Sequence, residues 1–143
     1  PKTKRYARGN RLILGVDYGT KRIGTALMHP EAGLAYPFEV ITYASKSEAI
    51  ERLLAVITKE NVSHVVFGLP IHADGTDNDL CRSIRSLAAI IAREGAITTE
   101  FIDERLTSVE AERILAGKRS RKKKGNVDML AAVLILEEYQ RKK

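Results

Sequence analysis

Short apolar runs separated by turn residues occupy the first third of the chain. Runs at residues 11–17 and 22–28 flank a polar stretch in which Gly19 favours a turn. The segment 38–43 follows a loop with two prolines and a glycine, and it is rich in β-branched and aromatic residues. This pattern predicts a β-hairpin followed by a third strand, which together form a meander.

The spacing of apolar residues then becomes helical. Ser45 and Glu48 have the spacing of a capping box, and the apolar positions after them recur at i, i+3, i+4 and i+7, which predicts a helix at residues 46–59. The next predicted elements are a buried strand at 64–68, a helix capped by Asp77 or Asn78, and a strand at 99–103. The chain therefore changes from a β-meander to alternating strands and helices.

Two further helices are predicted after the last strand. Thr107 and Glu110 have capping-box spacing and predict a short helix to about residue 116. Asn126 is a candidate cap for a final helix that runs to about Tyr139. The order of elements predicts an α/β fold with a mixed sheet, in which a three-stranded antiparallel meander adjoins two parallel strands and helices flank both.

Composition fits one soluble domain with a single core. The chain has 143 residues, of which 44% are hydrophobic and 29% charged, and no apolar run approaches the roughly 20 residues that span a bilayer. Its basic start is not followed by the apolar segment of a secretory signal. Cys81 is the only cysteine and has no metal-ligand spacing to another candidate, which favours a reducing cytoplasm.

The net charge of +6 is unevenly distributed along the sequence. Three segments without acidic residues hold 14 of the 24 lysines and arginines: an arm at 1–10 extended by Arg11, a loop at 117–126 and a tail at 141–143. Without Arg11 and that loop, the domain at 11–140 has 10 basic and 18 acidic side chains, a net charge of −8. Mobile cationic segments on an acidic body indicate a polyanionic partner, although such segments also serve solubility alone.

Acidic residues stand where predicted strands end. Asp17 ends the first strand and the pair Asp103 and Glu104 ends the last, and ligands of open α/β sheets bind beyond the carboxyl ends of strands. Asp128 begins an otherwise apolar stretch, where a charge needs a partner or a function. Three converging carboxylates are suited to bind two Mg²⁺ or Mn²⁺ ions for phosphodiester hydrolysis. Each acid alone also fits a structural role, Asp128 at a helix N-terminus and Asp103 as a cap or ion-pair partner of Arg105.

Four motifs in this order resemble a known family. They are Asp17 to Gly24 (DYGTKRIG), Gly68-Leu-Pro with Asp74-Gly-Thr, Asp103 to Thr107 (DERLT) with Glu110-Ala, and Val127-Asp with Ala131-Ala. The resemblance runs from about Leu12 to Tyr139. The sequence resembles the YqgF-type family of Holliday-junction-resolvase-like proteins and pre-16S ribosomal RNA nucleases.

This resemblance implies an RNase H-like fold and a nuclease that uses Mg²⁺ or Mn²⁺. It assigns both catalysis and metal binding to Asp17, Glu104 and Asp128, with Asp103 supporting those ligands. It further implies trimming of the 5′ end of the 16S ribosomal RNA precursor, with cleavage of a branched DNA junction as the alternative. The expected partners are nucleic acid and the ribosomal particle, and both a monomer and a homodimer are compatible with the sequence.

Residues beside these acids and in the basic loop are candidates for contact with nucleic acid. The basic ones could neutralise phosphates or pair with nearby carboxylates, and the glycine and proline belong to the Gly-Leu-Pro motif. The candidates are Lys21, Arg22, Gly68, Pro70, Arg105, Lys118, Arg119, Arg121, Lys122, Lys123 and Lys124. One departure from the family is the stretch after Pro70, where an Asn is expected and the chain offers His72 or a displaced Asn78. His72 could act as an acid or as a backbone contact.

Two other classes of function fit parts of this pattern. Nucleotide-binding ATPases related to actin and sugar kinases also start with Asp-x-Gly-Thr on a hairpin, but they need a second domain and a second phosphate hairpin that this sequence lacks. A non-catalytic RNA-binding or ribosome-binding module would explain the basic segments. The three acids argue against that module, and metal binding would distinguish it from a nuclease.

Overall fold

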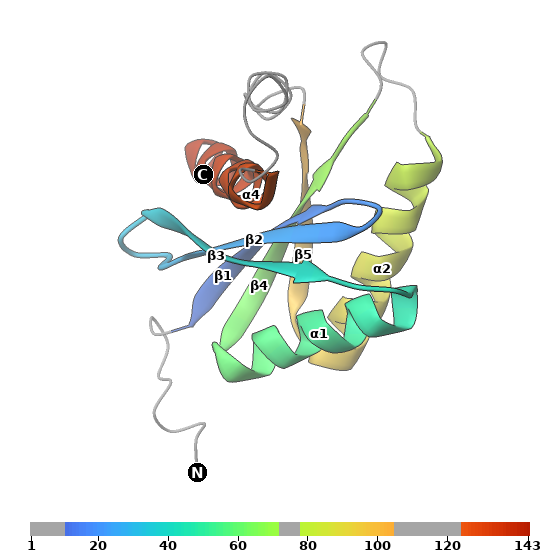
Figure 1. Cartoon of the computed structure of the whole chain (residues 1–143). Coiled ribbons are helices and arrows are strands. Elements are labelled where there is room, and N and C mark those ends of the chain that lie inside the picture. Colours follow the sequence, from blue (N-terminus) through green and yellow to red (C-terminus); the bar gives the residue numbers. More distant parts are fainter. Residues whose placement is uncertain (1–10, 72–77, 105–123) are drawn as a thin grey trace.

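A five-stranded mixed sheet forms the centre of the structure (Figure 1), a computed structural model that describes residues 11–71, 78–104 and 124–143, with backbone alone at 124–126. The elements are β1 (Leu12–Tyr18), β2 (Arg22–Met28), β3 (Ala35–Thr42), α1 (Lys46–Lys59), β4 (Val62–Leu69), α2 (Asp79–Gly95), β5 (Thr98–Asp103) and α4 (Lys124–Arg141). The strands lie in the order β3-β2-β1-β4-β5. The pairs β3·β2 and β2·β1 are antiparallel, whereas β1·β4 and β4·β5 are parallel, so the predicted mixed sheet is confirmed.

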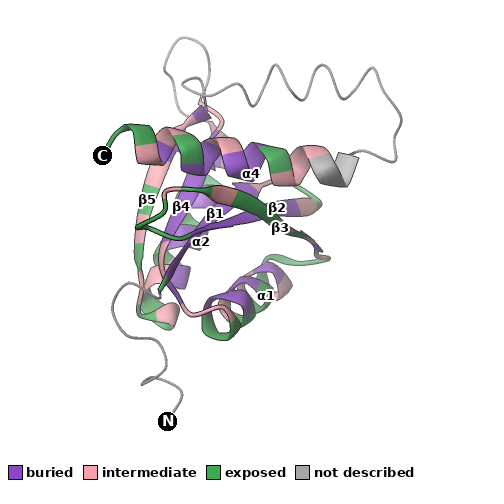
Figure 2. Ribbon diagram, turned by 90° about the vertical axis from the view of Figure 1, so that its left-hand side faces the viewer, coloured by how far each residue is buried: buried purple, intermediate pink, exposed green. Residues whose placement is uncertain are grey.

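Helices cover both faces of this sheet. In Figure 2, α4 crosses one face, whereas α1 and α2 lie against the other. Side chains of β1 alternate between the layers: Leu14 and Val16 pack in the core under α1 and α2, whereas Ile13 packs in a second core under α4. None of the described helices has the length and apolar character to cross a membrane.

The predicted capping box at the start of α1 is present. The Ser45 side chain accepts a hydrogen bond from the backbone N–H of Glu48, and the Glu48 carboxylate accepts one from the N–H of Ala44. Leu53, Val56 and Ile57 are buried on the face toward the sheet. The helix therefore begins and ends where its spacing predicts, because cap and apolar stripe agree.

Two predicted boundaries differ from the structure by three residues. β3 begins at Ala35 and runs through Pro37, three residues before its predicted start. Pro37 is tolerated because β3 is an edge strand: proline has no backbone N–H to donate, and on its outer side β3 has no neighbouring strand to receive such a bond. α4 begins at Lys124, so residues 124–126 of the predicted basic loop are helical and Asn126 lies inside the helix instead of capping it. The apolar run from Val127 shows where the helix becomes buried, whereas the helical backbone begins three residues earlier.

Glycines on three neighbouring strands let α4 approach the sheet closely. A Cβ atom on Gly15 of β1 would lie 2.6 Å from Leu136 Cγ, and one on Gly68 of β4 would lie 2.5 Å from Ile135 Cδ1. A Cβ atom on Gly24 of β2 would overlap the backbone carbonyl of Asp128. The helix axis is therefore fixed by the absence of side chains beneath it.

Candidate active site

Asp17 lies on the face of the sheet that α4 covers, at the edge where the parallel strands end. It follows Gly15 by two residues and pairs with Gly24 across the β1·β2 ladder, and both glycines face α4. On the other side of β1, Val16 pairs with Phe67 of β4, so the next residues of the two strands, Asp17 and Gly68, lie beside each other. Asp17 thus stands between two glycines of adjacent strands.

The other two predicted catalytic acids lie over these glycines. Asp128 is above Gly24, because its Cβ atom would be 2.9 Å from a Cβ there. Glu104 follows β5 directly, and its Cγ atom would be 3.1 Å from a Cβ on Gly68. Two strand spacings separate the glycines, roughly 10 Å in all. The structure therefore brings Asp17, Glu104 and Asp128 to one face and one edge, from β1, the end of β5 and α4.

These carboxylates are withdrawn from solvent to an unusual degree. Asp17 is 3% exposed and Glu104 is 7% exposed, and the side chain of Asp128 is 16% exposed. Neighbouring carboxylates repel one another at low dielectric, so cations stabilise such a group. Oxygen donors of this kind suit Mg²⁺ or Mn²⁺. As the side chains stand, however, the described residues contain no group of three or more acidic, histidine or cysteine side chains placed to hold a metal ion.

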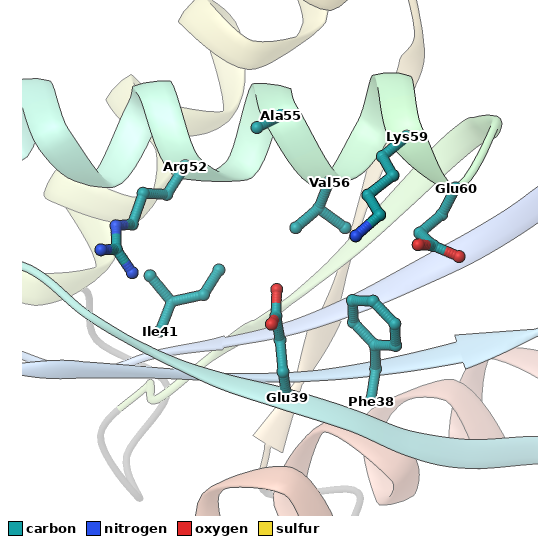
Figure 3. Close-up of a pocket in the computed structure, with 8 residues that line it drawn as sticks. All are labelled: Phe38, Glu39, Ile41, Arg52, Ala55, Val56, Lys59 and Glu60. Atoms are coloured by element: carbon teal, nitrogen blue, oxygen red, sulfur yellow. The ribbon is translucent and has the colours of Figure 1, made fainter.

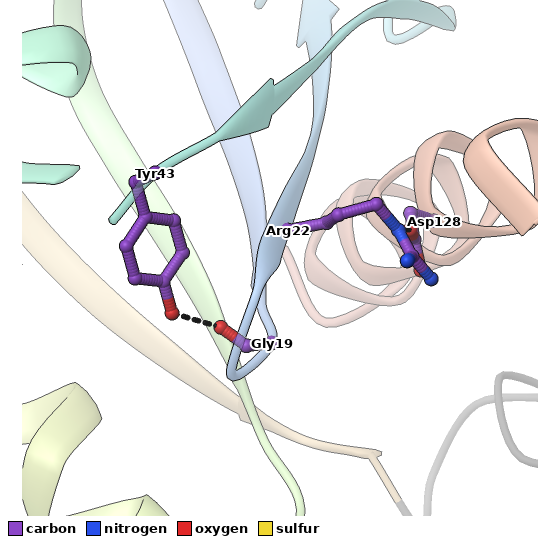
Figure 4. Close-up of polar contacts among 4 residues, drawn as sticks. All are labelled: Gly19, Arg22, Tyr43 and Asp128. Atoms are coloured by element: carbon purple, nitrogen blue, oxygen red, sulfur yellow. Dashed lines mark hydrogen bonds and ion pairs between the residues drawn. The ribbon is translucent and has the colours of Figure 1, made fainter. Parts of the chain in front are cut away.

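Arg22 forms an ion pair with the Asp128 carboxylate. Its Nε donates to Asp128 Oδ2 at 2.7 Å, and the two residues come from the first position of β2 and the first turns of α4 (Figure 4). Sequence reasoning placed Arg22 either on a phosphate or on a nearby carboxylate. The structure shows the second arrangement, with an acid 106 residues away in the chain.

A tyrosine fixes the turn that carries Arg22. The Tyr43 hydroxyl donates to the Gly19 carbonyl (Figure 4), and the ring stacks on Tyr18 with centroids 5.6 Å apart. Burial raises the pKa of Tyr43, and the neighbouring Tyr18 phenol adds to this shift. The sequence showed Tyr43 only as the last residue of a predicted strand, because nothing local indicates a hydrogen bond to a turn 24 residues earlier.

Asn78 joins the end of β4 to the start of α2. Its Oδ1 accepts from the backbone N–H of Cys81 at 2.9 Å, and its Nδ2 donates to the Pro70 carbonyl at 2.8 Å. Of the two caps that the sequence allowed, the structure therefore uses Asn78. The Asn78 side chain thus holds the backbone at the end of the Gly-Leu-Pro motif by hydrogen bonds.

Other predicted site residues lie away from this face or outside the described residues. Asp103 is the last residue of β5, and strand alternation directs it to the face opposite Ile102 and Glu104. Lys21 is exposed in the β1–β2 turn. Outside the described residues lie His72, the predicted helix from Thr107, Arg105 and the basic residues 118–123, and Lys124 is described by its backbone alone. Their roles stay predictions.

A cavity of about 240 Å³ lies in the opposite layer, between β3 and α1 (Figure 3). Phe38, Ile41 and Val56 supply its apolar lining, and Arg52 and Lys59 point toward it from α1. It includes none of the three acids. The three acids therefore lie on the opposite side of the sheet from this hollow.

Comparison with known proteins supports the motif-based assignment. The family model for RuvX, described as a Holliday junction resolvase, matches residues 11–142. The chain belongs to the RuvX family. A relative from Maridesulfovibrio salexigens, provisionally named a pre-16S rRNA nuclease, is 38% identical over 89% of this chain and 96% of its own length. A relative of the same provisional name from Paramagnetospirillum magneticum is 40% identical over 87% and 82%.

Solved structures share the fold of this RuvX-family chain. Thermus thermophilus RuvC in complex with a Holliday junction substrate has a TM-score of 0.60 at 12% identity, covering 92% of this chain and 94% of RuvC. The yeast mitochondrial Holliday junction resolvase has a TM-score of 0.58 at 12% identity, covering 92% and 78%. The predicted RNase H-like fold is confirmed, and the family is one of nucleases.

Proposed function

We propose that this protein is a metal-dependent nuclease that hydrolyses phosphodiester bonds and trims the 5′ end of the 16S ribosomal RNA precursor. One observation carries the proposal: Asp17, Glu104 and Asp128, from three distant segments, meet one face of the sheet at one edge. The provisional names of the curated relatives support the choice of substrate. The basic segments supply the charge that a polyanion requires.

The three carboxylates would hold Mg²⁺ or Mn²⁺. Bound there, divalent ions supply an activated water and stabilise the leaving oxygen of the phosphodiester. Asp17 has a fixed position because it lies within a ladder, between strands on both sides. Glu104 and Asp128 lie just beyond or within elements that pack on the sheet, so their approach depends on how α4 and the end of β5 are seated.

The exposed cations around this edge bind and orient the substrate. Lys21 and Arg22 belong to a turn that Tyr43 fixes, next to Asp17. Basic side chains at such a place position a phosphate backbone without reading its sequence. The basic loop before α4 adds affinity that depends on salt.

Holliday junction cleavage is the second candidate. It is favoured by the description of the RuvX family and by the fold shared with junction resolvases. The same hydrolysis would serve both substrates, since they differ in shape and not in the bond that is cut. A junction cutter with two-fold symmetry would act as a homodimer, whereas trimming needs one copy at the RNA end.

Cleavage assays with purified protein separate these functions. Labelled precursor ribosomal RNA and a four-way DNA junction are each incubated with Mn²⁺, with Mg²⁺ and with chelator. Cutting of RNA alone supports trimming, and cutting of the junction alone supports the second candidate. Intact substrates that are nevertheless bound would indicate a non-catalytic RNA-binding module.

Three conservative variants test the residues. Asp17→Asn, Glu104→Gln and Asp128→Asn should each reduce metal-dependent cleavage by at least about 100-fold, because each removes a charged ligand. Nucleic-acid binding should stay close to the wild-type level, because the basic segments supply most of the affinity. Asp79→Asn, an exposed acid at the start of α2, is the matched control. Full cleavage by all three variants would refute the site.

A further inference from the structure

Arg22 and Asp128 form an ion pair at the edge of the candidate active site. The distance between Arg22 Nε and Asp128 Oδ2 is 2.7 Å, and the Asp128 side chain is 16% exposed. The Arg22 side chain is 39% exposed, so its guanidinium also reaches solvent. One partner is thus a proposed metal ligand, and the other is a cation that solvent can reach.

This pair competes with a metal ion for the same oxygen. A guanidinium is permanently charged and donates strongly to carboxylates, so it offsets the negative charge that a divalent cation would offset. Close contact between the Asp128 backbone and Gly24 holds Asp128 at this edge of the sheet, beside Asp17. A metal ion can use Oδ2 fully only when the guanidinium moves away.

A phosphate group is the natural alternative partner for Arg22. The guanidinium binds phosphate and carboxylate in the same forked geometry. Arg22 begins β2 directly after the turn that contains exposed Lys21, so the two cations together can receive a backbone phosphate. The Arg22 side chain can therefore leave the Asp128 carboxylate and bind a phosphate of the nucleic acid instead.

We propose that Arg22 is a removable counter-ion of Asp128, which a nucleic-acid phosphate draws away so that the carboxylate can bind metal. Nucleic acid and metal then strengthen each other's binding, and by linkage each raises the affinity of the other by the same factor. Metal affinity is held low until substrate is present. This inference rests on the proposed function, since it requires Asp128 to be a metal ligand.

The test is calorimetric titration of Mn²⁺ into the full chain, without nucleic acid. Arg22→Gln should bind Mn²⁺ at least about fivefold more tightly than wild type, because the competing cation is gone. Lys21→Gln is the matched control: it removes the same charge one position away and should change the affinity by less than about twofold. Arg22→Lys retains the charge but not the fork, and it should lie between wild type and Arg22→Gln.

The second arm adds a short 2′-O-methyl RNA, with a gel to verify that it stays uncut and a titration of the RNA alone as a blank. The RNA should raise the Mn²⁺ affinity of wild type, whereas the increase in Arg22→Gln should be at least about threefold smaller. Thermal unfolding of each variant verifies that it folds. If Arg22→Gln binds Mn²⁺ no more tightly than Lys21→Gln, the counter-ion role is refuted.

Failure of the proposed function gives a different result. If Asp17→Asn and Asp128→Asn bind Mn²⁺ as tightly as wild type, these acids do not form a metal site, and both proposals fall. If those two variants lose Mn²⁺ binding while Arg22→Gln equals wild type, the metal site stands and only the exchange is wrong.

Discussion

At the scale of single residues, the hydrogen bond from Tyr43 to Gly19 connects the residue after β3 to the turn beside Asp17. That turn also holds a backbone bond of 2.9 Å from the Gly19 N–H to the Arg22 carbonyl. The two bonds restrict the loop that presents Lys21 and Arg22. One phenol thereby stabilises a cationic turn to which it contributes no charge.

Tyr43→Phe should lower the free energy of unfolding by about 1 kcal/mol, because a partly buried hydrogen bond to a carbonyl is lost. Chemical denaturation at neutral pH measures this change. Tyr36→Phe on β3 is the control: the Tyr36 side chain is exposed, so this variant should lower the free energy of unfolding by no more than about 0.5 kcal/mol. Equal losses in both variants would contradict the role of the Gly19 contact.

The pH dependence of the same residue has a definite sign. The folded state raises the pKa of Tyr43 above its ordinary value of about 10, so the folded state retains the proton to higher pH. Its contribution to stability is complete below pH 10 and declines as pH rises above that value. Unfolding of wild type should therefore become easier above pH 10, with a smaller decline in Tyr43→Phe.

At the scale of elements, the close seating of α4 determines where Asp128 lies. Gly24 lies directly beneath the Asp128 backbone, Gly15 beneath Leu136 and Gly68 beneath Ile135. Two of these three glycines also flank Asp17 on the neighbouring strands. Packing and chemistry therefore depend on the same missing side chains.

Gly24→Ala should push the start of α4 away from the sheet. The added methyl would overlap the Asp128 carbonyl, and overpacking of this kind costs about 1–3 kcal/mol. Cleavage should fall more than stability suggests, since Asp128 moves with the backbone. Measurements of unfolding and of cleavage below the melting temperature separate the two effects.

Gly95→Ala is the matched control for this substitution. Gly95 is the last residue of α2, and an added Cβ would meet Leu54 Cδ2 at 3.3 Å, the end of a flexible side chain. Alanine favours helix, so stability should stay level or rise slightly. Equal cleavage by Gly24→Ala and wild type would show that the seating of α4 does not position the site.

How much the sequence predicted follows from the range of each signal. The cap of α1 and the run of β2 are local, and both elements lie where the pattern placed them. The placement of Asp17 and Glu104 at one edge of the sheet followed from the rule that parallel strands present their carboxyl ends together. The pairing of Arg22 with Asp128 and of Tyr43 with Gly19 joins distant segments, and no spacing along the chain encodes such contacts.

At the scale of the whole molecule, charge and chemistry occupy different segments. Asp17 and Asp128 lie on packed elements and Glu104 lies directly after β5, whereas most of the surplus basic residues lie in sequence segments at 1–11, 118–124 and 141–143. Affinity and hydrolysis should accordingly be separable by mutation. A variant can lose one and retain the other.

Replacing Lys122, Lys123 and Lys124 with Gln should weaken nucleic-acid binding and make the slope of log affinity against log salt shallower by about two to three. Fluorescence anisotropy at several salt concentrations measures this slope. The control replaces Lys46, Arg52 and Lys59 with Gln and removes the same charge. These residues belong to α1, which lies on the face of the sheet opposite α4. Equal slopes for the two triple variants would mean that these three lysines make no phosphate contacts of their own.

The position of α4 in the chain order has a consequence for synthesis. All five strands precede it, yet α4 carries Asp128 and covers the apolar face formed by Ile13, Val66 and Ile102. At about 5–20 residues per second, a translating ribosome releases the whole sheet seconds before that helix emerges. During this interval the nascent chain bears an open apolar face that invites a chaperone, and it lacks one of its three acids. The proposed site is therefore incomplete until α4 has emerged and packed on the sheet.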